Sequence, residues 1–377
     1  MKFSARFPWD LRPNRLTQAL AAHRASGAPV LDLTESNPTR VDLAYPEEIL
    51  HAFEDPRILS YEPSPAGAAG AREAVSAYYA TRGQCVPPER VLLTASTSEA
   101  YSYLFKLLCD PGDEVLVPRP SYPLFEFLAE MESVRVRQYA LAYQGGWSLE
   151  APEFSDRTRA VVLVNPNNPT GSYIKRAELA ALAERCAARG TAVISDEVFA
   201  DYAFGDDPAR IVHLAGVEAC ATFCMSGLSK VAGLPQMKLG WIVANRPEAM
   251  ERLEWIADTY LSVGTPVQCA AARLLHAGEA VQKQIRERTA ANLTLARDML
   301  QGSRGTILAA EGGWCLTLQV PRVHTEEEWA LQLLKRDGVL VQPGFFYDFE
   351  SEAYLVVSLL TPPAVFRQGM TVLRGWL

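Results

Sequence analysis

The sequence predicts an α/β protein in which a large domain with a mostly parallel sheet is followed by a smaller α+β domain. Three observations support this prediction. The chain has 377 residues, enough for two or three domains of ordinary size. From about residue 89 to residue 245, short apolar runs alternate with helical stretches, as in a parallel sheet covered by helices on both faces. After residue 246 this alternation gives way to long helical stretches.

Six apolar runs are expected to be the buried strands of the large domain. Each is too short for a helix, and most are rich in Val, Ile and Leu and are bounded by Pro, Gly or polar residues. Helices are expected between the strands, because apolar residues recur there with helical spacing. The predicted strands are 91–93, 115–117, 160–164, 192–194, 221–225 and 241–244, and the predicted helices are 68–80, 98–108 and 176–189.

The C-terminal part is expected to form the smaller domain. Helical patterns run to about residue 256 and, after a loop, to about residue 300. Strands are expected at 315–320, 339–341 and 354–359, with helices at 325–335 and after Pro363. The resulting domain prediction is an N-terminal arm and helix that pack with the small domain (1–45), a large cofactor-binding domain (46–275) and a small C-terminal domain (276–377).

Composition limits the class of partner. The 36 Lys and Arg residues against 44 Asp and Glu give a net charge of −8, which leaves no basic excess for binding nucleic acid or an anionic membrane. The first residues carry charge where a signal peptide needs an apolar run, so we expect a cytoplasmic protein. Seven scattered cysteines and five histidines form no metal-ligand or catalytic-triad spacing. We therefore expect a small-molecule partner and no metal.

Polar residues follow the first and third predicted strands, where ligands bind in open α/β sheets. Ser96, Thr97 and Ser98 stand at the start of a helix, where hydroxyls and free N–H groups suit a phosphate, although an ordinary helix cap explains them equally well. The Asn- and Pro-rich stretch 165–171, which contains Asn168, is by itself only a turn.

Two charged residues follow the next strands of the predicted sheet. Asp196 lies at the end of a buried strand, where ionisation needs a cationic partner or several hydrogen bonds; its simpler interpretation is a helix N-cap. Lys230 lies among small residues close to the sheet, where a partly desolvated amine gains the lowered pKa of a nucleophile; its simpler interpretation is a surface lysine.

These positions provide a phosphate-binding site, an amide, an acid and a lysine. Pyridoxal 5′-phosphate (PLP) requires this set of groups. The segments that carry them resemble those of the class I and II aminotransferases, the aspartate aminotransferase-like PLP enzymes of fold type I. The match spans nearly the whole chain, with 28 residues between Asn168 and Asp196 and 34 between Asp196 and Lys230. The matching segments are 96–100, 120–123, 167–171, 196–198, 229–230 and 338–344.

This resemblance implies a role for each matching residue. Lys230 is the Schiff-base lysine of the internal aldimine and then the proton shuttle, and Asp196 holds the pyridinium N–H. Asn168 donates to the ring oxygen O3′, and Tyr122 stacks on the ring. Tyr61 resembles a tyrosine that reaches the phosphate of a neighbouring subunit, which implies a homodimer with shared sites. The implied phosphate-binding residues are Ser96, Thr97, Ser98, Ser226 and Lys238.

Four positions depart from the family pattern. Phe199 replaces a tyrosine that donates to O3′, and Gly227 replaces a phosphate-binding serine, with Ser226 adjacent. Lys238 replaces an arginine, which keeps the charge and loses the bidentate fork. Val356 stands where an arginine binds the substrate's α-carboxylate. Either the substrate has no such carboxylate, or another arginine reaches in, for which the N-terminal arm offers Arg6, Arg12 and Arg15.

The function that the resemblance implies is PLP-dependent transamination, in which an amino acid or amine and a 2-oxo acid react in turn by a ping-pong mechanism. Two alternatives stay open at this point. One is a PLP-dependent carbon–sulfur β-lyase, because the same lysine and pyridinium serve elimination. The other is a PLP-binding regulatory protein without catalysis, in view of Phe199 and Val356. The sequence does not name the donor, because fold resemblance never determines a substrate.

Overall fold

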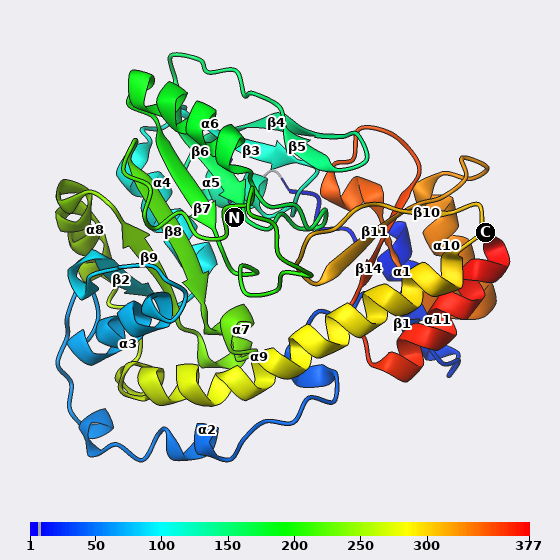
Figure 1. Ribbon diagram of the computed structural model, residues 1–377, viewed down its shortest axis with the longest axis horizontal. Helices are drawn as coiled ribbons and strands as arrows, with labels where there is room; N and C mark the ends of the chain where they lie inside the picture. Colours follow the sequence, from blue (N-terminus) through cyan, green and yellow to red (C-terminus); the bar gives the residue numbers. More distant parts are fainter. Residues whose placement is uncertain (7–8) are drawn as a thin grey trace.

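The computed structural model describes residues 1–6 and 9–377. It contains a large α/β body and a smaller α+β body, joined by one long helix (Figure 1). Phe7 and Pro8, which belong to the expected N-terminal arm, lie outside the described residues. The predicted fold class is confirmed.

The large body is organised around an eight-stranded sheet with the order β2-β9-β8-β7-β6-β3-β4-β5. The neighbouring pairs from β8 to β4 are parallel, whereas β9 runs antiparallel to both of its neighbours and β5 runs antiparallel to β4. The strands are β2 (Val91–Thr94), β3 (Glu114–Arg119), β4 (Arg135–Tyr143), β5 (Trp147–Leu149), β6 (Thr158–Val164), β7 (Ala192–Asp196), β8 (Thr222–Gly227) and β9 (Gly240–Ala244).

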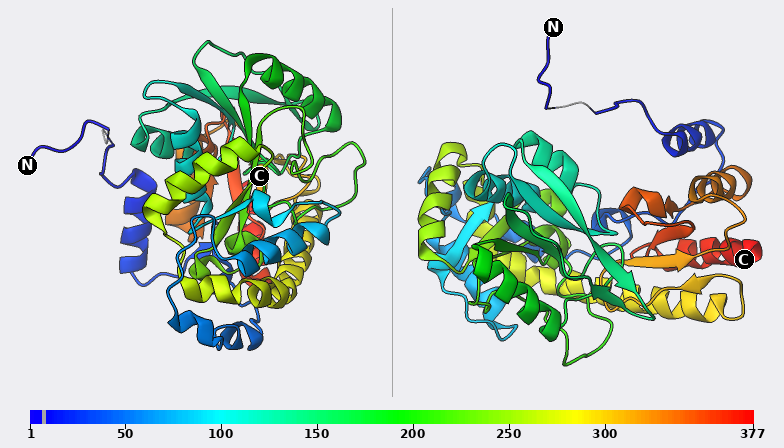
Figure 2. Two further views of the ribbon diagram at one scale, coloured as in Figure 1. Left: turned by 90° about the vertical axis from the view of Figure 1, so that its left-hand side faces the viewer. Right: turned by 90° about the horizontal axis from the view of Figure 1, so that it is seen from above.

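Helices cover both faces of this sheet, and the alternation of side chains along each strand explains why (Figure 2). In β7, Val193 belongs to the apolar cluster that includes α3 (Ala69–Ala80) and α6 (Arg176–Arg189). The next residue, Ile194, belongs to the opposite cluster, with α4 (Thr97–Leu108), α5 (Phe125–Met131) and α8 (Pro247–Tyr260). The central strands are therefore apolar on both faces, and their polar residues gather at the strand ends.

The small body contains a four-stranded antiparallel sheet with the order β10-β11-β14-β13. Its core is shared with the N-terminal segment, because β1 (Leu31–Asp32) pairs in parallel with β12 (Val339–Leu340) and α1 (Arg15–Ala25) packs on α10 (Glu326–Asp337). The other elements are β10 (Thr306–Ile307), β11 (Cys315–Gln319), β13 (Gln342–Pro343), β14 (Tyr354–Ser358) and α11 (Pro363–Trp376).

The long helix α9 (Thr265–Leu300) connects the two bodies. It packs on α3 and on the short helices α2 (Glu48–His51) and α7 (Leu228–Val231) of the large body, and on α11 and β10 of the small body. The domain boundary expected at residues 275 and 276 falls inside this continuous helix. Among the described residues, no helix has the length and apolar character needed to cross a membrane.

The predicted strands differ from the structure in several places. β4 and β5 were not predicted, because β4 lacks the continuous apolar run of a strand buried on both faces, as Arg135, Val136 and Arg137 show, and β5 is a short edge strand. The two-residue strands β1 and β10 were not predicted either. The strand expected at 339–341 is instead divided into β12 and β13, which pair with different strands. The strand expected at 221–225 is β8, displaced toward Gly227.

Close packing between α9 and α7 positions the segment that contains Lys230. A Cβ atom on Gly278 of α9 would lie 2.3 Å from the Cβ atom of Ala232. Nearby, the side chain of Gln282 donates to the backbone oxygen of Val231 at 2.8 Å. The approach of the two backbones therefore requires glycine at position 278.

We predict that Gly278→Ala lowers the free energy of unfolding by about 1–3 kcal/mol, because overpacking pushes α9 away from Ala232. Gly375→Ala is the matched control, since it lies in α11 with no heavy atom within 4 Å of an added Cβ. The control should keep or raise the melting temperature, because alanine favours helix. Equal melting temperatures for the two variants would contradict this account of the contact.

Candidate active site

A cavity of about 370 Å³ lies at the carboxyl ends of the central strands, between the large and small bodies. This volume falls in the range of roughly 300–1,000 Å³ that is typical of ligand sites. Six of the residues singled out by sequence line it together: Thr97, Ser98, Tyr122, Asn168, Asp196 and Lys230. The remaining lining residues include Trp314, Cys315, Gln342 and Tyr347 from the C-terminal part and Thr34 and Ser36 after β1.

Lys230 projects into this cavity from α7, directly after β8. Its Nζ atom lies 4.6 Å from the ring centroid of Trp314 and 5.5 Å from that of Phe199. Burial lowers the pKa of the amine to about 8. The backbone is held in place, because the Tyr202 hydroxyl donates to the Lys230 carbonyl oxygen. A fraction of the amine is therefore neutral, and nucleophilic, close to physiological pH.

Asp196 lies at the end of β7 and lines the same cavity. Its carboxylate accepts a hydrogen bond from Tyr101 Oη at 3.1 Å and one from the Val198 backbone N–H at 3.3 Å. Burial raises its pKa to about 6. Among the described residues, no basic side chain forms an ion pair with it. This acid therefore suits a ligand that brings a positively charged N–H group.

Asn168 follows β6, and its amide orientation depends on a residue from the small body. The thiol of Cys315 donates to Asn168 Oδ1 at 3.2 Å, and burial raises the pKa of that thiol to about 12, so it keeps its proton. Because the amide oxygen is engaged, the Nδ2 group is the part of Asn168 that remains to donate to a ligand in the cavity.

The start of α4 provides N–H groups and hydroxyls at one end of the cavity. Thr97 and Ser98 line it. Ser96 does not, because its hydroxyl caps α4 by accepting from the Glu99 N–H at 3.2 Å. The backbone just before this helix packs closely on Gly240, since an added Cβ there would lie 3.0 Å from Thr94 Oγ1 and 3.1 Å from the Ser96 carbonyl carbon. A helix N-terminus with free hydroxyls is a suitable site for a phosphate group.

Three other predicted site residues lie outside this cavity. Ser226 is buried with its hydroxyl 3.5 Å from the carbonyl oxygen of Glu197. Lys238 is exposed, with its backbone in the left-handed region at φ 51°. Tyr61 is 76% exposed and borders a separate, smaller cavity.

The sequence matches the family model for aminotransferase class I and II over residues 28–365. It is 28% identical to the LL-diaminopimelate aminotransferase of Desulforudis audaxviator (strain MP104C), over 96% of this chain and 94% of that protein. It is 30% identical to the arginine–pyruvate transaminase of Pseudomonas aeruginosa, over 76% of this chain and 74% of that protein. The structure superposes on the alanine aminotransferase of Pyrococcus furiosus with a TM-score of 0.88, at 22% identity and with 100% and 99% of the two chains covered.

The chain belongs to the aminotransferase class I and II family. This confirms the resemblance seen in the sequence, and the fold agrees with it. Members of the family use PLP. Within the described residues, no group of three or more His, Cys, Asp and Glu side chains is arranged to hold a metal ion.

Two departures from the aminotransferase pattern can now be placed in the fold. Phe199 lines the cavity beside Lys230. Val356 is buried in β14, in register between Thr317 and Gln342, and Gln342 lines the cavity. Lys230 is the one basic side chain among the described residues that line this cavity.

The three arginines of the arm make contacts elsewhere in this aminotransferase chain. Arg6 donates to the Met131 carbonyl oxygen at 3.0 Å, Arg12 pairs with Asp10, and Arg15 pairs with Glu327. In this chain, therefore, none of the three lines the cavity that contains Lys230.

Sequence reasoning missed several lining residues. Tyr101 lies one helical turn after Thr97 and therefore on the same face of α4, so the spacing could have predicted that it lines the cavity. Trp314 and Cys315 begin a strand that was predicted, but no local pattern brings that strand to Asn168, 147 residues earlier in the chain.

We predict that Asp196→Asn stabilises the cofactor-free protein at neutral pH. Because folding raises the pKa of Asp196, this acid stays protonated to a higher pH in the native state than in the unfolded chain. Its contribution to stability therefore falls as pH rises from about 4 to about 6. The substitution should raise the free energy of unfolding by on the order of 2 kcal/mol at pH 7.5 and change it little at pH 4, as measured by urea unfolding.

Asp113→Asn is the control, and its effect on stability should have the opposite sign. The pKa of Asp113 is lowered by its hydrogen bonds with Arg159, so this variant should lose stability above pH 4 and little below it. A destabilised Asp196→Asn protein at pH 7.5 would contradict the account of Asp196.

Proposed function

We propose that this cavity binds PLP and that the protein transfers amino groups between an amino donor and a 2-oxo acid. The observation that supports it best is that one cavity brings together a lysine with a lowered pKa and an acid with a raised pKa, with which no basic side chain of the described residues forms an ion pair. These groups fit the cofactor, because Lys230 suits its aldehyde and Asp196 suits its pyridinium N–H.

The remaining lining residues have proposed roles in holding the cofactor. Thr97 and Ser98, with the N-terminus of α4, would bind the phosphate, while Ser96 would act through its cap of that helix. Asn168 would donate to the ring oxygen, and Tyr122 would pack on the ring. When bound, PLP supplies an electron sink that stabilises negative charge at the substrate's α-carbon.

Lys230 would carry the proton that transamination moves. In its neutral form, the amine of Lys230 would remove the proton from the substrate's α-carbon and give it back later in the transfer. A pKa of about 8 suits this work near neutral pH. Closure between the two bodies would exclude water, since Trp314, Cys315 and Tyr347 of the C-terminal part lie opposite Lys230.

We further propose a homodimer in which Tyr61 reaches the partner's phosphate site. Tyr61 is 76% exposed and lies close in sequence to Leu59, which is 88% exposed, as suits a segment covered by a second subunit. Ser226 and Lys238 stay proposed phosphate-site residues; the side chain of Lys238 is exposed and would have to turn inward.

We predict that Lys230→Ala lowers turnover by about a thousandfold or more, because one residue supplies both nucleophile and proton shuttle. The measurement is amino transfer to a 2-oxo acid by the PLP-loaded enzyme, with ammonia followed in parallel. Lys283→Ala, whose side chain is 71% exposed on α9, is the control and should keep full activity. Near-normal activity of Lys230→Ala would refute the site, and ammonia released in place of amino transfer would favour the lyase.

We predict that Phe199→Tyr lowers the pH midpoint of the visible absorption band of the PLP-loaded enzyme. A hydroxyl at this position would donate to the ring oxygen and stabilise its anionic form, with each pH unit worth ~1.4 kcal/mol. Spectroscopic pH titration measures the shift. An unchanged or higher midpoint would show that position 199 does not face the ring.

A further inference from the structure

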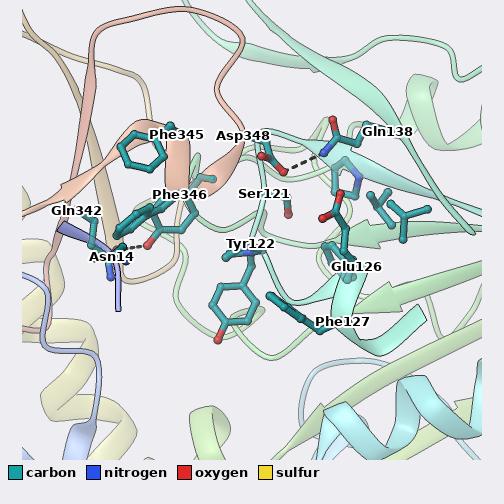
Figure 3. Close-up of a pocket in the computed structure, with 16 residues that line it drawn as sticks. Asn14, Ser121, Tyr122, Glu126, Phe127, Gln138, Gln342, Phe345, Phe346 and Asp348 are labelled. Carbon is teal, nitrogen blue, oxygen red and sulfur yellow. Dashed lines mark hydrogen bonds between the residues drawn. The ribbon is translucent and has the colours of Figure 1, made fainter. Parts of the chain in front are cut away.

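A second cavity, of about 420 Å³, is drawn in Figure 3, and it shares part of its wall with the cavity that contains Lys230. Four residues line both cavities: Tyr122, Phe125, Gln342 and Tyr347. The two cavities are therefore neighbours, and a substrate whose amine reacts at Lys230 would have to pass these shared side chains to enter the second cavity. Nothing in the chemistry of transamination itself requires this additional space.

The charges around the second cavity are negative. Glu126 and Asp348 are its two charged side chains among the described lining residues (Figure 3). One carboxylate oxygen of Asp348 accepts from Gln138 Nε2 at 2.9 Å, which orients it. The nearest arginine, Arg119, donates to the Asp348 backbone oxygen and pairs with Glu350, so its charge is directed to another carboxylate.

Aromatic side chains form much of the remaining wall. Six line the cavity: Tyr122, Phe125, Phe127, Phe345, Phe346 and Tyr347. Aromatic faces attract cations, and carboxylates beside them add a direct attraction, whereas a second carboxylate on the ligand would be repelled. The wall therefore favours a cationic group and disfavours an anionic one.

The first cavity points to the same class of substrate. Its described lining residues include no arginine, and the position of the family's carboxylate-binding arginine is Val356. A donor that needs no such arginine, and that brings a positive charge at its far end, satisfies both cavities.

We propose that the amino donor carries a second positively charged group and no carboxylate, as in a diamine, and that this second group binds between Glu126 and Asp348. The inference rests on the proposed transamination at Lys230. It assigns Glu126 and Asp348 as specificity-determining residues, with Gln138 as the residue that positions Asp348.

The test compares three donors of equal length with the PLP-loaded enzyme: 1,5-diaminopentane, 1-aminopentane and 5-aminopentanoate. We expect kcat/KM to be about tenfold or more higher for the diamine than for the neutral amine, and lowest for the anionic donor. Asp348→Asn and Glu126→Gln should each lower kcat/KM for the diamine by about fivefold and leave 1-aminopentane within about twofold. Glu287→Gln, whose side chain is 66% exposed on α9 and does not line the cavity, is the control and should change neither.

Binding to the cofactor-free protein provides a second readout. In calorimetry, 1,5-diaminopentane should bind more weakly to Asp348→Asn than to the unmodified chain, and more weakly at higher ionic strength. Equal use of the three donors, or unaltered preference in both variants, would overturn the inference while transamination stands. Failure of every amino donor to transfer its amine would instead overturn the proposed function.

Discussion

The desolvation of Lys230 is the constraint on which the rest of the active site depends. An amine with a pKa near 8 exists only where water is excluded, and the structure excludes it with Trp314, Phe199 and the buried end of β8. Asp196 completes the arrangement as an acid that burial keeps partly protonated until a cationic ligand arrives. The shifted pKa values mean that the charged forms of both residues cost stability in the unliganded protein, as we expect for a site that binds the charged cofactor proposed above.

That site is held in place by contacts that reach across the fold. The Lys230 backbone is fixed by Tyr202, and the α7 segment by Gln282 and the close approach of Gly278 to Ala232. Because Gly278 and Gln282 lie on α9, the helix that joins the two bodies also supports the reactive lysine. The small body contributes the opposite wall, so movement between the bodies would change the cavity.

The two neighbouring cavities have different proposed roles, one in the reaction and one in the choice of substrate. In the proposals made above, the first cavity holds the groups for amino transfer, and the second holds the acidic and aromatic groups that would discriminate among donors. With valine at position 356, recognition would shift away from the α-carboxylate. The family gives the class of reaction, and the side chains particular to this chain would select the substrate.

The sequence by itself determined the fold class, the family and six of the polar residues that line the cavity, because a residue that follows a buried strand is carried to the same sheet edge as its neighbours. Lys230, Asp196 and Asn168 needed only strand periodicity and the order of motifs. Tertiary structure alone decided that Cys315 orients Asn168 and that Lys238 faces solvent. Those outcomes depend on side-chain direction and on contacts between distant segments, which local patterns do not encode.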